Sequence, residues 1–380
     1  MAPRPRQRAP TTSAAGRLRE WLEPALQSLW YQRSPSQTKR LLRALLAPLA
    51  ALTAAIGKRR RQAIRRLPAP AVPVVVVGNL VAGGAGKTPL VEALVEALAQ
   101  RGWKPGIVAS GYGARRRDAR LVGPTDDAIE HGDEPVLLAR RTGRPVAAGR
   151  ARAQAVRALL AAHPSIDVVV SDDGLQHTGL ARSIEIAVFD ERGAGNGRCL
   201  PAGPLRAPLS QADEMDAIVL NGQARPPIAH QRVFRFRIEP LRFVALGGHV
   251  APVPAREFAS RLGADAVVAL AATGAPQRFF DTLRTLGVDA HEIALADHAA
   301  ISPTRLDAIE APWILMTEKD AVKCATWADA RCWYLEVRAL VEPALADWLT
   351  ETLHGRTPAR DPCLSAVQGT AEAAARRPLR

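Results

Sequence analysis

The sequence predicts an α/β protein: a P-loop NTPase-like, doubly wound and mostly parallel sheet, with a second, smaller α/β domain. Three observations predict this class. The β-branched run Val74–Val77 is typical of a strand buried in a parallel sheet. A glycine-rich turn follows it, and a helical pattern at Pro89–Gln100 completes a strand–turn–helix unit. Further apolar runs alternate with helical patterns such as Ala151–Ala162, as expected of βαβ units.

The order of the remaining elements predicts two α/β domains. After the first helix, strand candidates follow at 106–109, 146–148, 168–170, 184–189 and 217–220. Alternation at Val233–Ile238 predicts linker strands, and the second domain then has a strand near Val267, a helix at Gln277–Leu286 and a strand at Ile314–Met316. The predicted divisions are a disordered basic extension at 1–20, a membrane-associated helical segment at 21–68, the P-loop domain at 69–230, linker strands at 231–240, the second domain at 241–354 and a disordered tail at 355–380.

The net charge of +14 is concentrated at the N-terminus. Residues 1–66 hold 15 Lys and Arg but only Glu20 and Glu23, which gives +13 and leaves +1 for the other 314 residues. A nearly neutral body is not typical of a nucleic-acid-binding protein, so we expect no nucleic-acid partner. The four cysteines show no zinc-binding spacing and fit a reducing, cytosolic compartment.

An apolar stripe with basic flanks marks the N-terminal segment, formed by Leu41, Leu45, Leu49, Leu52 and Ile56. The uncharged run Ala44–Gly57 would be about 21 Å long as a helix, which is short of the roughly 30 Å of a bilayer core. Pro48 would also kink it. We therefore expect an amphipathic helix lying on an anionic membrane surface. The alternatives are a helix packed on the protein's own core and a nucleic-acid-binding arm, in which the apolar length would have no use.

The glycine-rich turn is a predicted phosphate loop. Its residues are Gly83, Gly84, Ala85, Gly86, Lys87 and Thr88. Glycines let backbone N–H groups face a phosphate, the lysine neutralises its oxygens, and the threonine hydroxyl can ligate Mg²⁺. The usual first glycine of such loops is replaced by Val81, and Ala82 replaces the additional lysine of the GGxGKT variants. The loop's sequence fits an adenine nucleotide and a guanine nucleotide equally well.

Paired carboxylates follow the strand at 168–170. Asp172 and Asp173 lie in Ser171-Asp-Asp-Gly-Leu-Gln-His177, at the edge of the sheet where ligands bind. In an extended chain they would point to opposite faces, so one could hold Mg²⁺ and the other could serve the substrate. The alternative is an acidic turn that caps the next helix.

Three further candidates are weak on their own. Asp133, in Gly-Asp-Glu-Pro, is also typical of a helix start. His298 is a lone histidine, a class more often solvated or structural than catalytic. Arg206, in Leu-Pro-Ala-Gly-Pro-Leu-Arg, is a candidate phosphate-facing cation or a surface arginine on a rigid loop.

Taken in order, these segments resemble the tetraacyldisaccharide 4′-kinases, the lipid A 4′-kinases of Gram-negative bacteria. The matching segments are VPVVVVGNLVAGGAGKTP, GDEP, SDDGLQH, RGAGNGRCLPAGPLR, RFFDTL, ADH and LMTEKDAVKC, spread over roughly Trp21 to Leu353. The resemblance implies ATP- and Mg²⁺-dependent transfer of the γ-phosphate to the 4′-hydroxyl of tetraacyldisaccharide 1-phosphate. It also implies work at the cytoplasmic face of the bacterial inner membrane.

The resemblance also implies roles for the candidates. Asp133 would be the base with help from His298, and Lys87 would act on the phosphates. Asp172, Asp173 and Arg206 would bind substrate, and Thr88 with the two aspartates would hold the metal.

Three positions depart from the family pattern: Gly111, Ala207 and Ala299 replace an arginine, an acidic residue and a histidine. The alternative function is a membrane-associated P-loop regulatory NTPase without a lipid acceptor, which would leave Arg206 and the Asp133–His298 combination unexplained.

Overall fold

The computed structural model describes residues 25–32, 34–248 and 250–356. The predicted disordered extension at 1–20 lies outside these residues, as does the predicted tail apart from 355 and 356. Within them, the strands are β1 (Val74–Gly78), β2 (Pro105–Ala109), β3 (Arg120–Val122), β4 (Val146–Ala148), β5 (Val168–Asp172), β6 (Ile184–Phe189), β7 (Ala217–Asn221), β8 (Val233–Ala245), β9 (Val253–Pro254), β10 (Val267–Ala271), β11 (His291–Ala294), β12 (Trp313–Thr317) and β13 (Cys332–Val341).

These strands form one sheet with the order β11-β10-β12-β13-β8-β7-β6-β1-β5-β2-β4-β3, and β9 pairs with β8. The pairs β3–β4, β8–β13 and β8–β9 are antiparallel, and the other strand pairs of the sheet are parallel. The predicted mostly parallel α/β class is therefore confirmed. The five strands predicted between 106 and 220 appear within two residues of their expected bounds.

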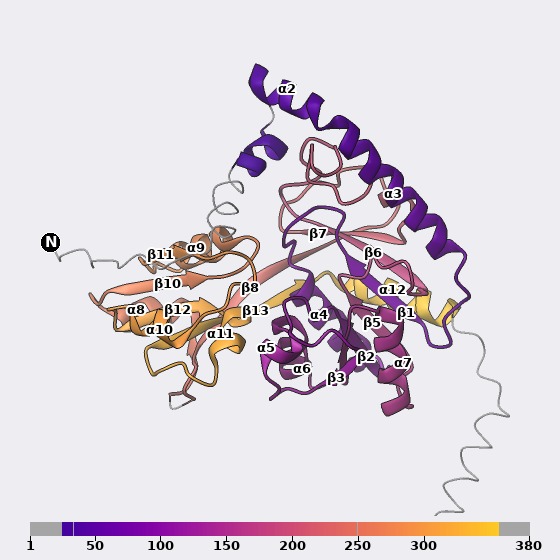
Figure 1. The fold of residues 1–380 in the computed structure, drawn as a ribbon. Helices are drawn as coiled ribbons and strands as arrows, with labels where there is room; N and C mark the ends of the chain where they lie inside the picture. Colours follow the sequence, from indigo (N-terminus) through magenta and orange to yellow (C-terminus); the bar gives the residue numbers. More distant parts are fainter. Residues whose placement is uncertain (1–24, 33, 249, 357–380) are drawn as a thin grey trace, which may run out of the picture.

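Helices cover both faces of the sheet (Figure 1). They are α2 (Gln37–Leu45), α3 (Ala47–Arg65), α4 (Lys87–Gln100), α5 (Ala128–His131), α6 (Asp133–Thr142), α7 (Arg152–Ala162), α8 (Phe258–Leu262), α9 (Pro276–Thr285), α10 (Pro303–Asp307), α11 (Glu318–Cys324) and α12 (Pro343–Arg356), with short 3₁₀ turns at Leu209–Glu214 and Ala255–Glu257. We call β1–β7 with α4–α7 the first lobe, and β10–β12 with α8–α11 the second lobe. The division of the chain into two domains stays a prediction, because one sheet runs through both lobes.

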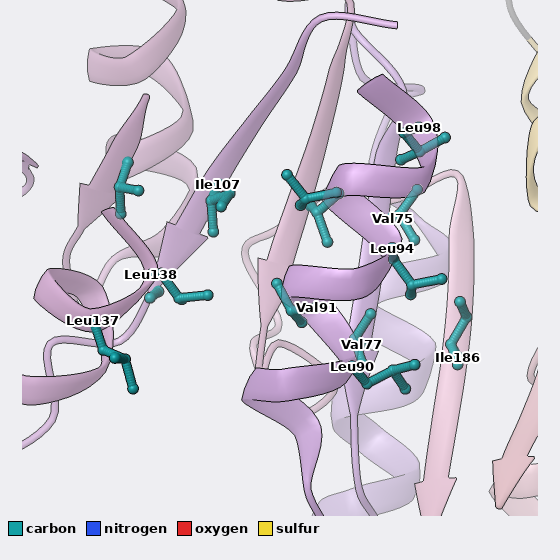
Figure 2. Packing of buried hydrophobic residues seen from close by; sticks show 14 of the residues in the cluster. Val75, Val77, Leu90, Val91, Leu94, Leu98, Ile107, Leu137, Leu138 and Ile186 are labelled. Carbon is teal, nitrogen blue, oxygen red and sulfur yellow. The ribbon is translucent and has the colours of Figure 1, made fainter. Parts of the chain in front are cut away.

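Helix α4 fixes the phosphate loop to the core of the first lobe. Its apolar residues Leu90, Leu94 and Leu98 repeat at helical spacing and are buried against Val75 and Val77 of β1 (Figure 2). The C-terminal helix α12 returns to this same core, where Leu345, Leu349 and Leu353 pack with it. The last helix of the predicted second domain thus completes the core of the first lobe.

The N-terminal apolar segment forms two helices that run along one side of the molecule (Figure 1). The axes of α2 and α3 are bent by 49° where Leu46 separates them, with Pro48 in the first turn of α3. No single helix among the described residues is long and apolar enough to cross a membrane; the bent pair passes this test only by length and composition.

The predicted leucine stripe points away from the protein. Leu41 is 67% exposed and Leu45 76% exposed, and Leu49, Leu52 and Ile56 are exposed as well. The buried face of α3 is narrow, with Ala50, Gly57 and Ile64. The structure therefore does not show this stripe packed on the protein's own core.

Candidate active site

The phosphate loop lies between β1 and α4, and its backbone requires glycine. Gly83 and Gly86 have φ values of +97° and +84°, which side chains other than glycine rarely adopt. A Cβ at Gly86 would also come within 2.7 Å of Asn221 Nδ2. Asn79 Nδ2 donates to the Gly83 carbonyl at 2.8 Å, and Lys87 Nζ lies 3.3 Å from Asn79 Oδ1. The loop is thus held open at the N-terminus of a 14-residue helix, a favourable place for an anion.

The segment before the loop's glycines is braced by the loop that contains Arg206. Val81, at the position where most P-loops have glycine, forms an antiparallel bridge with Leu205. Ala82 N–H donates to the Pro204 carbonyl at 2.8 Å. The valine that replaces the usual glycine therefore packs in the core, where Val81 is 4% exposed. Ala207, another departure, packs beside Gly57 of α3.

The two adjacent aspartates have different partners. Asp172 Oδ2 accepts a hydrogen bond from Thr88 Oγ1 at 3.0 Å. Asp172 Oδ1 is buried and has no partner, and burial raises the pKa of this carboxyl to about 7. Asp173 lies 3.2 Å from Arg206 and 3.6 Å from Lys87. Burial opposes the ionisation of Asp173, but these two cations outweigh it and hold its pKa below the usual range.

This arrangement fits a divalent cation at Asp172. A buried carboxylate oxygen without a partner is costly, and a hydroxyl and a carboxylate side by side are oxygen ligands of the kind Mg²⁺ takes. The described residues contain no group of three His, Cys, Asp or Glu side chains placed to hold a metal. A magnesium site of this kind typically has only one or two protein ligands and completes its coordination with nucleotide phosphates and water.

Asp133 and His298 come from different lobes and meet. Asp133 begins α6 and is 5% exposed, and His298 follows β11 with a φ of +60°. His298 Nδ1 lies 3.0 Å from Asp133 Oδ2, and Glu134 N–H donates to Asp133 Oδ1 at 2.9 Å. Burial opposes ionisation of Asp133, but the hydrogen bond from His298 and the charges of Lys319 and Lys323 lower its pKa to about 2. Asp133 is thus held as a carboxylate.

The second lobe adds two lysines for which the sequence predicted no role. Lys319 Nζ lies 2.8 Å from Glu134 Oε1 and 3.4 Å from His298 Nε2. Lys323 Nζ lies 3.6 Å from Asp133 Oδ2 and 2.7 Å from Asp320. Although burial opposes it, the carboxylates around Lys319 raise its pKa. The signal was present as two lysines four residues apart in the segment LMTEKDAVKC, a spacing that puts both on one face of a helix.

A contact between the lobes places the Asp133–His298 pair near the phosphate loop. A Cβ at Gly274 would lie 3.2 Å from Asp297 Oδ2 and 3.4 Å from the Gly84 nitrogen. Asp297 is the neighbour of His298, so the same small region joins the histidine and the loop. Arg206, which pairs with Asp173, also lines a pocket of about 190 Å³ beside α3. The pocket is lined by Thr53, Ile56, Gly57, Arg60, Arg61, Ile64, Leu80, Leu175, Gln176, Arg206, Ala207, Gln211 and Met215.

Comparisons with known proteins agree with one another. The family model described as Tetraacyldisaccharide-1-P 4'-kinase matches residues 42–354. The Tetraacyldisaccharide 4'-kinase of Bordetella parapertussis is 45% identical over 331 residues, which cover 83% of this chain and 94% of that one. The protein of the same name from Dechloromonas aromatica is 45% identical over 333 residues, covering 86% and 98%.

A solved structure shares the fold. The crystal structure of an "apo" form of LpxK from Aquifex aeolicus in complex with ATP superimposes with a TM-score of 0.67 at 26% identity, covering 82% of this chain and 99% of that one.

Proposed function

The chain belongs to the tetraacyldisaccharide 4′-kinases, the ATP-dependent kinases of lipid A biosynthesis, and we propose that it transfers the γ-phosphate of ATP to the 4′-hydroxyl of tetraacyldisaccharide 1-phosphate. The observation that carries this proposal is the buried Asp133–His298 pair beside a phosphate loop. A nucleotide switch needs the loop alone, whereas an acceptor hydroxyl needs a group that takes its proton.

Nucleotide binding is assigned to the phosphate loop. Gly83, Gly84, Ala85 and Gly86 supply backbone N–H groups, and Lys87 supplies the cation for the phosphates. Thr88 and Asp172 would hold Mg²⁺, with Asp173 beside them. When bound, the ion would neutralise charge that develops on the transferred phosphoryl group. Asp173 keeps Lys87 and Arg206 in place, since it lies within 3.6 Å of both.

Proton removal is assigned to the Asp133–His298 pair. The acceptor hydroxyl would give its proton to Asp133, with His298 orienting and polarising the carboxylate through the 3.0 Å contact. Lys319 and Lys323 keep this carboxylate ionised in a buried place. Phosphoryl transfer depends mainly on positioning. A base held by His298, the Glu134 N–H and Lys323 suits this requirement.

The acceptor is assigned to the pocket beside α3. Its lining combines polar side chains, among them Arg206 and Gln176, with apolar ones such as Leu80, Leu175 and Ile64, a mixture suited to a phosphorylated sugar that carries acyl chains. The exposed leucines of α2 and α3 lie on the neighbouring surface. We place these helices on the anionic cytoplasmic face of the inner membrane, so that the acyl chains can stay in the bilayer while the sugar reaches the loop.

Labelled ATP and tetraacyldisaccharide 1-phosphate in mixed micelles test this function. The unmodified protein is expected to label the lipid. Asp133→Asn keeps the shape of the side chain but removes the base, and should lower turnover by roughly 10²–10⁴-fold with little change in ATP binding. Asp347→Asn is the matched control, because Asp347 lies exposed on α12 and pairs only with Arg101 in the described ion pairs. ATP hydrolysis without labelled lipid would contradict the proposal and favour a regulatory NTPase.

A further inference from the structure

A cluster of one aspartate and two arginines holds the tip of the phosphate loop. Asp190, just after β6, is 4% exposed, and its Oδ2 lies 2.7 Å from Arg192 Nη2 and 2.6 Å from Arg278 Nη2. Both arginines also donate to the Gly84 carbonyl, Arg192 at 2.7 Å and Arg278 at 3.2 Å. Burial opposes ionisation of Asp190, but the two guanidinium groups outweigh it and hold its pKa below the usual range. Arg278 is the member of this cluster that comes from the second lobe, on α9.

The segment that carries Arg278 also touches His298. The Ala272 carbonyl accepts a hydrogen bond from the His298 N–H at 3.1 Å. Two residues further on, Gly274 packs between Asp297 and the nitrogen of Gly84. The segment 272–278 therefore contacts the phosphate loop at one end and the histidine at the other. Its position sets where His298 lies relative to the loop.

Arg278 could bind a nucleotide phosphate or support the loop, and the loop atom that it contacts distinguishes these two roles. A phosphate is bound by the N–H groups of such a loop. Arg278 instead reaches a carbonyl oxygen of Gly84, and its charge is matched by the buried Asp190. This geometry is that of a support beneath the loop, and not that of a phosphate ligand.

We propose that Arg278 is a positioning residue, whose bridge from Asp190 to the Gly84 carbonyl seats the second lobe on the phosphate loop and thereby places His298 against Asp133. This inference rests on the proposed kinase function. It assigns Arg278 no contact with substrate: the arginine acts through His298. A misplaced catalytic group costs as much as about 100-fold in rate even when the change lies away from the reacting atoms.

The first test compares arginines on one helix. Arg278→Ala should lower kcat for lipid phosphorylation by about 10- to 100-fold, while the dissociation constant for a fluorescent ATP analogue stays within threefold of the unmodified protein. Arg278→Lys keeps the charge and should recover part of the loss. Arg284→Ala is the matched control, because Arg284 also lies on α9 but pairs with Asp281 and Glu292 at the surface. A tenfold weaker binding of the ATP analogue would overturn the proposal in favour of a phosphate ligand, as would activity equal to that of Arg284→Ala.

The second test is a double-mutant cycle with His298→Ala. If Arg278 acts through His298, Arg278→Ala should cost less than threefold in a protein that already lacks the imidazole. Equal losses with and without His298 would overturn the proposal. Where Arg278→Ala does not fold, Arg278→Lys and Arg278→Gln enter the same cycle. If the unmodified protein does not label the lipid, the proposed function itself fails, which is a different result from a labelled lipid with an inert Arg278.

Discussion

Three carboxylates share one arginine behind the candidate site. Arg141 of α6 lies 3.4 Å from Glu92 of α4 and 4.0 Å from Glu318 of α11, and it is paired most closely with Glu336 of β13. Burial raises the pKa of Glu92 and that of Glu318 to about 7, and the attraction of Arg141 does not compensate. The helices α4, α6 and α11 also carry Lys87, Asp133 and the lysines Lys319 and Lys323, so the charge of this cluster bears on how these helices are held together.

Glu92→Gln is therefore expected to stabilise the protein, by an amount that grows as the pH rises from 4.5 to about 7 and is nearly constant above it. The pKa of Glu92 is raised from 4.5 to about 7, so the folded state binds this proton more tightly than the unfolded state. Stability from this group is full below pH 4.5 and is lost as the pH rises through 7. At 1.36 kcal/mol per pH unit between pH 4.5 and about 7, the loss at pH 8 is about 3 kcal/mol. The isosteric amide has no charge to bury and avoids this loss.

Urea unfolding at several pH values measures the effect. The free energy of unfolding of Glu92→Gln should exceed that of the unmodified protein by about 3 kcal/mol at pH 8 and by at most ~1 kcal/mol at pH 5. Glu96→Gln is the control, because Glu96 lies on the exposed side of the same helix. A difference that does not change between pH 5 and pH 8, or a less stable Glu92→Gln at pH 8, would refute the reasoning.

Three further predictions concern the phosphate loop and the N-terminal helices α2 and α3. Lys87→Met should abolish lipid labelling and weaken binding of a fluorescent ATP analogue, because it removes the cation from the loop; equal binding would argue against its role. Gly86→Ala should cost about 1–3 kcal/mol, since the φ of Gly86 is +84°, and thermal melting measures this. The double change Leu45→Glu and Leu49→Glu should abolish flotation with vesicles that contain anionic lipid, while phosphorylation of a detergent-dispersed substrate persists.

Local pattern was enough to predict most strands and helices of the first lobe, although it missed the short elements β3 and α5. Val74–Val77 and Val168–Val170 are buried on both faces and carry the β-branched residues that such a position favours. The pairing of β13 with β8 and the return of α12 to the first lobe could not be predicted in this way. Both depend on contacts between residues about a hundred or more positions apart, and nothing in the local sequence of α12 indicates which core it joins.

The residues of the candidate site also differ in whether the local sequence could reveal them. The phosphate loop carries its chemistry in consecutive residues, so Lys87 and Thr88 were evident from the sequence alone. Asp133 and His298 became candidates of weight only through the resemblance, since they are 165 positions apart. Arg278 and Lys319 were not recognised at all. Each looks like an ordinary surface cation on a helix, and its partners become apparent only when the two lobes are in contact.

The adjacent aspartates show how a turn can separate two equal side chains. Alternation along an extended strand would send Asp172 and Asp173 to opposite faces, but β5 ends at Asp172 and Asp173 has a φ of +49°. The chain therefore turns Asp173 toward Lys87 and Arg206, which supply it with positive charge. Asp172 stays buried, with one oxygen that has only the Thr88 hydroxyl and another that has no partner. A divalent cation is stabilised most where negative charge is least compensated, so of the two carboxylates Asp172 is the one we expect to bind it.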